Sequence, residues 1–230
     1  MAGLLALVGA FVAGSFARRL LRQFHGRRRH HTLAWGVSLG LYGIGMVALA
    51  IGLLFGWSAA AYGAYWFTGA LVNVPLLAVG ELHLLAPARA RWWWILAGGA
   101  TAWALVAVIM SSFDPGVLAA ATADGGIPLG ADVLGDQPAY AALAPLTLTG
   151  TVVVLVGTVW SAARARRPAV LLIAVGVVVA AMSSALVRSD LDALVPVALT
   201  AGVAIMYAGF HATVARRGRL IQPLGRHRNA

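Results

Sequence analysis

Two residue types are missing from this 230-residue chain, and a third class is scarce. There is no cysteine, which excludes disulfide bonds and thiolate metal sites. There is no lysine either, so all 17 basic residues are arginine, against only seven acidic residues. Charged residues make up 10% of the chain, whereas an ordinary soluble domain has about 25%. A chain with so few charged residues cannot form a surface that is polar enough for water. We therefore expect most of its surface to lie in an apolar solvent.

Apolar residues dominate instead, at 61% of the chain and a mean hydropathy of +0.86. A helix that crosses the hydrocarbon core of a bilayer, about 30 Å thick, needs roughly 20 such residues. Backbone polar groups cannot stay unpaired in lipid, so the long apolar runs must be helices. The sequence therefore predicts an all-α, polytopic membrane protein, a seven-transmembrane-helix bundle. The expected spans lie near residues 1–17, 33–55, 60–85, 92–112, 139–163, 169–187 and 193–215, followed by a basic tail over 216–230.

The arginines are placed asymmetrically along this layout. Clusters follow the first, third, fifth and seventh spans, and Arg188 alone follows the sixth. With seven spans, all four clusters fall on one side, which the positive-inside rule makes cytoplasmic. We therefore predict a multi-pass protein of the cytoplasmic (inner) membrane, with its N-terminus outside and its C-terminus inside. The absence of lysine beside abundant Ala, Val, Leu and Gly suggests a GC-rich bacterial genome.

The most basic segment, RRLLRQFHGRRRHH (residues 18–31), is interpreted as the first cytoplasmic loop. Clustered basic residues beside a span attract anionic lipid headgroups, which makes the membrane surface the expected partner. A protein partner could also dock on the cytoplasmic arginine loops. Nucleic acid is not expected, because topology already accounts for the positive charge. The predicted headgroup contacts are Arg18, Arg19, Arg27, Arg28 and Arg29.

One long loop, residues 112–138, contains four of the seven acidic residues and is punctuated by Gly and Pro. Its carboxylates lack the regular spacing of a calcium site. We expect this loop to be a solvated extracytoplasmic cap. The more specific alternative is that it forms a lid over an outward-facing pocket.

A weak internal repeat relates the two halves of the chain. LVGAFVAGSFARR (7–19) resembles LVGTVWSAARARR (155–167), and both segments end in arginines. The pattern outlines a 3+1+3 parallel repeat, a layout similar to that of small sugar transporters. The matching segments are short and low in complexity, so chance similarity is the alternative.

Ionisable groups inside spans are costly and by default mark function. The third span has the most polar residues, and at about 100° per residue several of them share a face. Glu81 is the first candidate, as a proton-coupling carboxylate or a cation ligand. Its plainer alternative is an ion pair with a loop arginine at the membrane edge. The predicted solute or ion pathway consists of Tyr62, Tyr65, Trp66, Asn73 and Glu81.

His83 and His211, at similar depths in the third and seventh spans, are candidate ligands of a haem or another metal. Interfacial hydrogen bonding is the plainer alternative, so no cofactor and no metal-binding residue is predicted. Motifs such as G-x-S-x-G, H-E-x-x-H and Walker A are absent from the sequence. The seven-span layout resembles that of retinal proteins, which attach retinal through a lysine. A chain without lysine excludes that chemistry.

Three functions stay open from the sequence. The first is a small-solute or ion transporter with a cavity along the third span. The second is a membrane sensor or accessory subunit without catalysis of its own. The third is an intramembrane redox or lipid-modifying enzyme that uses His83, His211 and Glu81.

Overall fold

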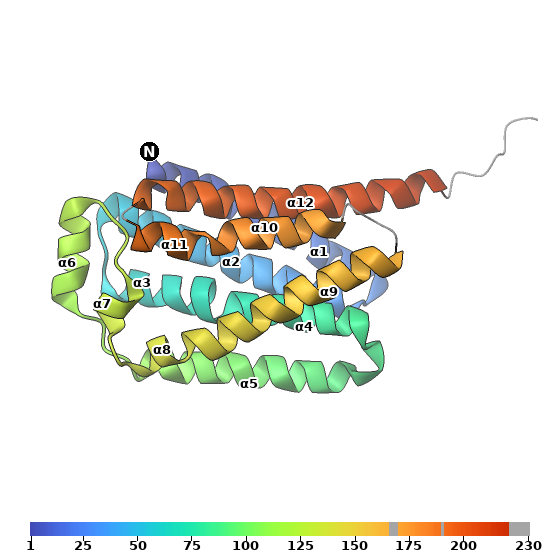
Figure 1. The fold of residues 1–230 in the computed structure, drawn as a ribbon, viewed down its shortest axis with the longest axis horizontal. Coiled ribbons are helices and arrows are strands. Elements are labelled where there is room, and N and C mark those ends of the chain that lie inside the picture. Colours follow the sequence, from blue (N-terminus) through green and yellow to red (C-terminus); the bar gives the residue numbers. More distant parts are fainter. Residues whose placement is uncertain (166–169, 190, 221–230) are drawn as a thin grey trace, which may run out of the picture.

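A computed structural model describes the backbone of residues 1–165, 170–189 and 191–220, and side chains as far as residue 213. Arg166 and Arg167, and residues 221–230 of the predicted tail, lie outside the described residues. Figure 1 shows long helices packed side by side along one axis. They are α1 (Ala2–Arg27), α2 (His30–Phe55), α3 (Ala59–Tyr65) with η1 (Trp66–Val72) and α4 (Asn73–Leu85), α5 (Ala90–Ile109), α9 (Thr149–Ala165), α10 (Leu171–Ala181) with α11 (Ser183–Arg188), and α12 (Val195–Leu220). Short helices complete the chain: η2 (Pro87–Arg89), α6 (Pro115–Asp124), α7 (Gly130–Leu134), α8 (Pro138–Ala141), η3 (Ala144–Leu148) and η5 (Asp192–Leu194).

Seven helices within the described residues are long and apolar enough to cross a bilayer. They are Ala2–Arg27, His30–Phe55, Ala59–Leu85, Pro87–Ile109, Pro138–Arg164, Leu171–Arg188 and Asp192–Thr213. The described residues contain no strand. An all-helical chain with seven candidate spans is therefore confirmed.

The outside of the bundle is apolar. Large side chains point away from the protein, including Phe11, Ile95, Val156 and Trp160, each at least 60% exposed. A lateral groove of about 540 Å³ between α4, α5 and α9 is lined almost entirely by apolar side chains. Such a surface is unfavourable in water and is solvated well by lipid chains.

The expected first loop is mostly helix. Residues 18–27 continue α1, because Arg, Leu and Gln are good helix formers and no proline interrupts them. Arg28 then adopts the left-handed conformation with φ 47°, and its N–H donates to the carbonyl of Phe24. Chain reversal is complete by His30, where α2 begins. The first arginine cluster is thus held on a rigid helix end.

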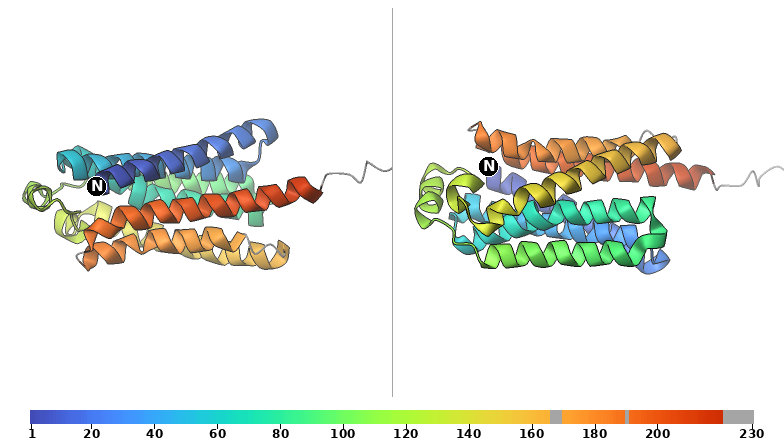
Figure 2. Two further views of the ribbon diagram at one scale, coloured as in Figure 1. Left: turned by 90° about the horizontal axis from the view of Figure 1, so that it is seen from above. Right: turned by 60° about the horizontal axis from the view of Figure 1, so that its bottom comes forward.

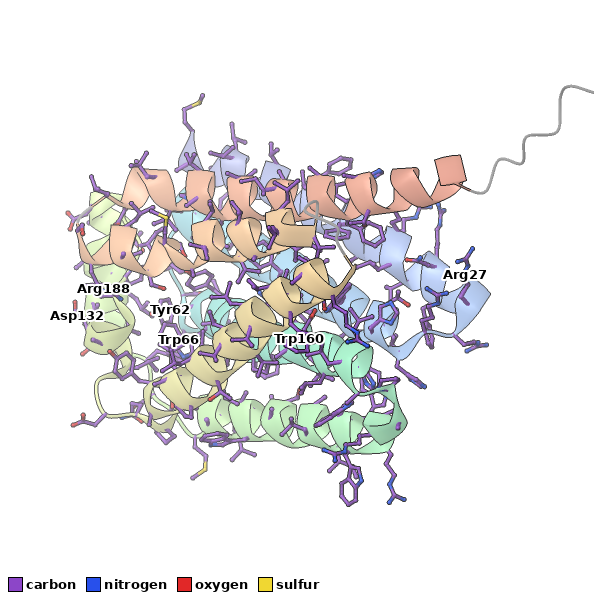
Figure 3. All side chains as sticks on the ribbon, turned by 45° about the vertical axis from the view of Figure 1, so that its right-hand side comes forward. Arg27, Tyr62, Trp66, Asp132, Trp160 and Arg188 are labelled. Carbon is purple, nitrogen blue, oxygen red and sulfur yellow. The ribbon has the colours of Figure 1, made fainter. Side chains whose placement is uncertain are left out.

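The two ends of the bundle differ. We call the end with Arg27 and the α1–α2 turn the basic end, and Arg188 lies at the opposite end (Figure 3). Both views in Figure 2 show α6 and α7 lying beyond the long helices at that opposite end, which we call the cap end. The expected loop there is partly helical, because Asp114 caps α6 by accepting hydrogen bonds from the N–H groups of Gly116 and Val117.

Glycine brings two pairs of helices into backbone contact. A Cβ atom built on Gly176 of α10 would lie 2.5 Å from the Gly202 carbonyl oxygen of α12, and one on Gly202 would lie 2.7 Å from the Gly176 carbonyl oxygen. A Cβ on Gly45 of α2 would lie 3.1 Å from the Gly69 Cα in η1. Small residues of this kind let membrane helices approach closely.

Candidate functional site: an interior cavity

A cavity of about 250 Å³ lies between the second, third, fifth, sixth and seventh spans, and we call it the central cavity. Three departures from regular helix meet there. The third span has a π-helical segment at Trp66–Val72, the fifth has another at Ala144–Leu148, and the sixth has a mild irregularity at Met182, which keeps right-handed helical φ and ψ. Irregular backbone at membrane depth is tolerated where it lines a cavity, and π-helical turns occur often at functional sites.

Pro75 accounts for the irregularity in the third span. Proline has no N–H, so it cannot donate to a carbonyl of the preceding turn. Thr147 of η3 supplies a substitute donor, because its Oγ1 donates to the Ala70 carbonyl at 2.9 Å. The two π-helical segments are therefore joined by a hydrogen bond beside the cavity.

Asn73 is buried and its carboxamide is oriented by α2. The Ser38 hydroxyl lies 2.6 Å from Asn73 Oδ1 and 2.8 Å from the Asn73 carbonyl oxygen. With its oxygen used as an acceptor, Asn73 keeps its NH₂ group available on the cavity side. Tyr65 lines the same cavity, as does Tyr42, whose hydroxyl donates to the Leu199 carbonyl at 2.9 Å.

Glu81 lies outside the central cavity, nearer the basic end. It is 3% exposed and is the one buried acidic side chain among the described residues. Ser161 Oγ donates to Glu81 Oε1 at 3.1 Å, and Gly157 packs directly against the Glu81 side chain. Among the described residues, Glu81 forms no ion pair with a loop arginine, which was the plainer alternative. Glu81 instead faces two hydroxyl-bearing residues of α9, Thr158 and Ser161.

A second cavity, of about 660 Å³, is open at the basic end, and we call it the basic-end cavity. Glu81, Arg29 and Arg164 line it together with several hydroxyl groups. A narrow space of about 20 Å³, the neck, separates it from the central cavity. Glu81 and Thr158 border both the neck and the basic-end cavity, while Leu77 and Met206 border both the neck and the central cavity. The other neck residues are apolar: Phe16, Trp35, Leu39, Val154, Ile173, Val177 and Phe210.

The cap end is closed by an aromatic cluster. Tyr62 stacks on Trp66 with ring centroids 5.9 Å apart, and Trp57, Tyr65 and Phe113 surround Tyr62. Figure 3 shows Tyr62 and Trp66 side by side toward the cap end. Of the predicted pathway residues, these two therefore close one end of the bundle. Tyr65 and Asn73 line the central cavity, and Glu81 lies beyond the neck.

The chain between α6 and α7 is tied to this cluster through three consecutive residues. Trp57 Nε1 donates to the Gly126 carbonyl at 2.9 Å, and the Tyr62 hydroxyl donates to the Pro128 carbonyl at 3.4 Å. Between them, the Ile127 N–H donates to Asp192 Oδ2 at 2.8 Å. Residues 126–128 thus form a plug over the cap end, and Ile127 is buried.

The sequence did not reveal two of these plug contacts. Trp57 is 7% exposed and donates to the plug instead of facing the membrane interface. Asp192 directly precedes the seventh helix, yet its carboxylate accepts from the plug. An Asp before an apolar helix and a Trp after a glycine have common local explanations, so no sequence signal singled them out.

The two candidate histidines lie in separate clusters. His83 is buried and stacks with His30 and Trp94, at centroid distances of 5.4 and 5.2 Å. His211 instead accepts a hydrogen bond from Arg19 Nη1, with 2.7 Å between Nη1 and Nε2, and its ring meets Tyr207. Among the described residues, no group of three or more His, Cys, Asp or Glu side chains could hold a metal ion.

Four of the five arginines predicted to meet lipid headgroups are exposed: Arg18, Arg27, Arg28 and Arg29. Arg19 is half-buried and lies over the Phe210 ring as well as binding His211. Its guanidinium group therefore joins α1 to α12 inside the bundle.

No family model, curated protein or solved structure matches this chain. The fold and the site consequently define its class by themselves. Seven helices that are long and apolar enough to cross a bilayer indicate a multi-pass membrane protein.

Proposed function

We propose that this chain is a small-solute transporter of a bacterial cytoplasmic membrane, with the N-terminus outside and the C-terminus in the cytoplasm. The central cavity is the binding site for the solute in this proposal. The observation that carries it is the meeting of three irregular helix segments around that cavity. Helical irregularities occur often at functional sites, and helices that depart from regular geometry form the binding sites of many secondary transporters.

The asymmetry of the two ends supports the same proposal. Transport by alternating access requires a site that is reached from one side while the other side is closed. Here the plug and the aromatic cluster close the cap end, and a cavity opens at the basic end. The neck between the cavities is narrow and apolar, so small side-chain movements would open or close it. This conformation corresponds to an inward-facing state with its inner gate nearly shut.

Glu81 is proposed to couple transport to an ion or a proton. It borders the neck, and no other buried acidic side chain occurs among the described residues. A solute that enters or leaves the central cavity through the neck passes this carboxyl group. The exposed arginines of α1 are proposed to bind anionic lipid headgroups, which would hold the basic end at the cytoplasmic surface.

Uptake into vesicles tests this proposal. The purified protein is placed in liposomes, and uptake is measured for a panel of radiolabelled sugars, polyols, amino acids, carboxylates and amines. Ala181→Phe adds a ring to the lining of the central cavity and should abolish uptake. Ala185→Phe adds the same ring to a position of the same span that is exposed like Ala181 but lies outside the cavity lining, and should leave uptake intact.

Coupling is tested by Glu81→Gln, because glutamine can still accept the hydrogen bond from Ser161 but cannot ionise. We expect the variant to lose accumulation driven by a proton or sodium gradient. Accumulation equal to that of the unmodified protein would remove Glu81 from the coupling role. If no solute in the panel enters faster than it enters protein-free vesicles, the proposal that this chain is a transporter is wrong.

A further inference from the structure

We infer that the central cavity takes a small, uncharged solute whose hydroxyl or amide groups both donate and accept hydrogen bonds. The inference rests on the proposed function and names the substrate class of the same cavity. It combines the absence of charge in the lining, the number of polar groups left to bind a ligand, and the size of the cavity.

No acidic or basic side chain lines the central cavity. A charged solute would therefore lose its water without meeting an opposite charge, which is the most costly kind of burial. The carboxyl group of Glu81 borders the neck and not this cavity. Asp192 lies close enough to Tyr65 to act on it electrostatically, but it is outside the lining and accepts a hydrogen bond from the plug. The basic-end cavity differs in this respect, because it presents both arginines and Glu81. Charged species can collect there, but the site beyond the neck excludes them.

The central cavity nevertheless presents many polar groups. The hydroxyls of Tyr65, Thr151, Ser183 and Ser184 line it, and none of them has a hydrogen-bond partner among the described residues. The NH₂ group of Asn73 also has no hydrogen-bond partner among the described residues, because only the Oδ1 atom of that side chain is hydrogen-bonded. Polar groups inside a membrane-embedded bundle must be satisfied by something other than lipid.

The chemistry of these groups selects the ligand. A hydroxyl donates one hydrogen bond and accepts others, and an NH₂ group donates two. A solute hydroxyl or amide can both donate hydrogen bonds to these groups and accept hydrogen bonds from them. A carboxylate only accepts hydrogen bonds, and an ammonium group only donates them. Four hydroxyls and one amide therefore match a polyol or a small amide better than either ion.

The volume limits the size of that solute. At about 30 Å³ for each water molecule, a cavity of 250 Å³ holds roughly eight waters. Pockets for drug-sized ligands start at about 300 Å³, so the solute is smaller than these. A four-carbon polyol such as erythritol fits in this volume with room for some of that water.

Three probes of one size and different charge test the inference in liposomes that contain the full chain. They are radiolabelled erythritol, its carboxylic acid erythronate, and 4-amino-1,2,3-butanetriol. We expect erythritol to enter, and each charged analogue to enter at least about a hundredfold more slowly, because its charge would be buried without a partner. Entry of a charged analogue at the erythritol rate or faster would overturn the inference and leave the transporter proposal standing. Failure of all three probes would also overturn it, and the wider panel with Ala181→Phe would then decide the transporter proposal independently.

A charge placed in the cavity provides a second readout. Ser184→Asp puts a carboxylate into the lining, so the preference should move from erythritol toward the amine. Ser189→Asp makes the same change just after α11, at a position that is exposed like Ser184 but lies outside the lining, and should leave the preference unchanged. An unchanged preference in a folded Ser184→Asp protein would show that the solute binds elsewhere.

Discussion

The backbone contact between α10 and α12 makes a sharp prediction about stability. Gly176→Ala adds a methyl group that would lie 2.5 Å from the Gly202 carbonyl oxygen and 2.9 Å from the backbone nitrogen of Met206. Backbone atoms cannot swing aside like the end of a flexible side chain, so the two helices must separate. Overpacking of this kind typically costs about 1–3 kcal/mol.

Helix propensity opposes this cost, because alanine favours a helix over glycine by up to about 1 kcal/mol. Gly98→Ala supplies the matched control, since a Cβ atom on Gly98 of α5 meets nothing within 4 Å. The difference between the two variants cancels the propensity and leaves a steric cost of about 1–3 kcal/mol.

The assay is reversible unfolding of each variant in mixed detergent micelles, followed by circular dichroism. We expect Gly98→Ala to be as stable as the unmodified protein or more stable, and Gly176→Ala to be less stable. The double variant Gly176→Ala with Gly202→Ala should lose less unfolding free energy than the sum of the two single variants. The reason is that one separation of the two helices makes room for both methyl groups. Equal stability of Gly176→Ala and Gly98→Ala would refute the close approach of α10 and α12.

Three further predictions test other parts of the structure. Thr147→Val leaves the Ala70 carbonyl without its side-chain donor and should cost about 1–3 kcal/mol in the same unfolding assay, while Thr147→Ser should restore most of it. Trp66→Phe removes the hydrogen bond to the Ala139 carbonyl, so amide hydrogen exchange near Ala139 should speed up by about tenfold for a loss of about 1.4 kcal/mol. Because the chain has no native cysteine, single cysteines at positions 27 and 124 report the orientation: an impermeant reagent added to intact cells should label position 124 and not 27, and the reverse would invert the proposed topology.

The sequence predicted the helices well because lipid imposes a simple rule. Uncharged runs of sufficient length must be helical, and the structure has seven such helices among its described residues. Their ends were harder to predict, since helix propensity carries α1 ten residues past its apolar stretch to Arg27. A span is defined by hydropathy, whereas a helix continues until its backbone is interrupted.

The interior was predicted only in part. Polarity correctly drew attention to Asn73 and Glu81, but one helix could not show that a neck separates them. Gly36 and Gly40 have a G-x-x-x-G spacing, which is typical of close helix approach, yet a Cβ on Gly40 would meet nothing within 4 Å and one on Gly36 would meet only leucine side chains. The closest backbone contact joins Gly176 and Gly202, which are 26 residues apart. Which glycine faces a partner depends on how the helices are rotated, and a single sequence does not fix that rotation.

The plug has a consequence for the kinetics of the proposed transporter. Four hydrogen bonds join the cap to the long helices: those of Trp57 N to Thr122 Oγ1, Trp57 Nε1 to Gly126, Tyr62 to Pro128, and Ile127 to Asp192. At about 1 kcal/mol each, breaking them together costs about 4 kcal/mol, so about one molecule in a thousand is open at that end. No cavity-lining residue takes part in these bonds. An opening step slower than the other steps would set the same maximal velocity for every accepted solute of the proposed transporter, and solutes would then differ only in the concentration that gives half of that velocity.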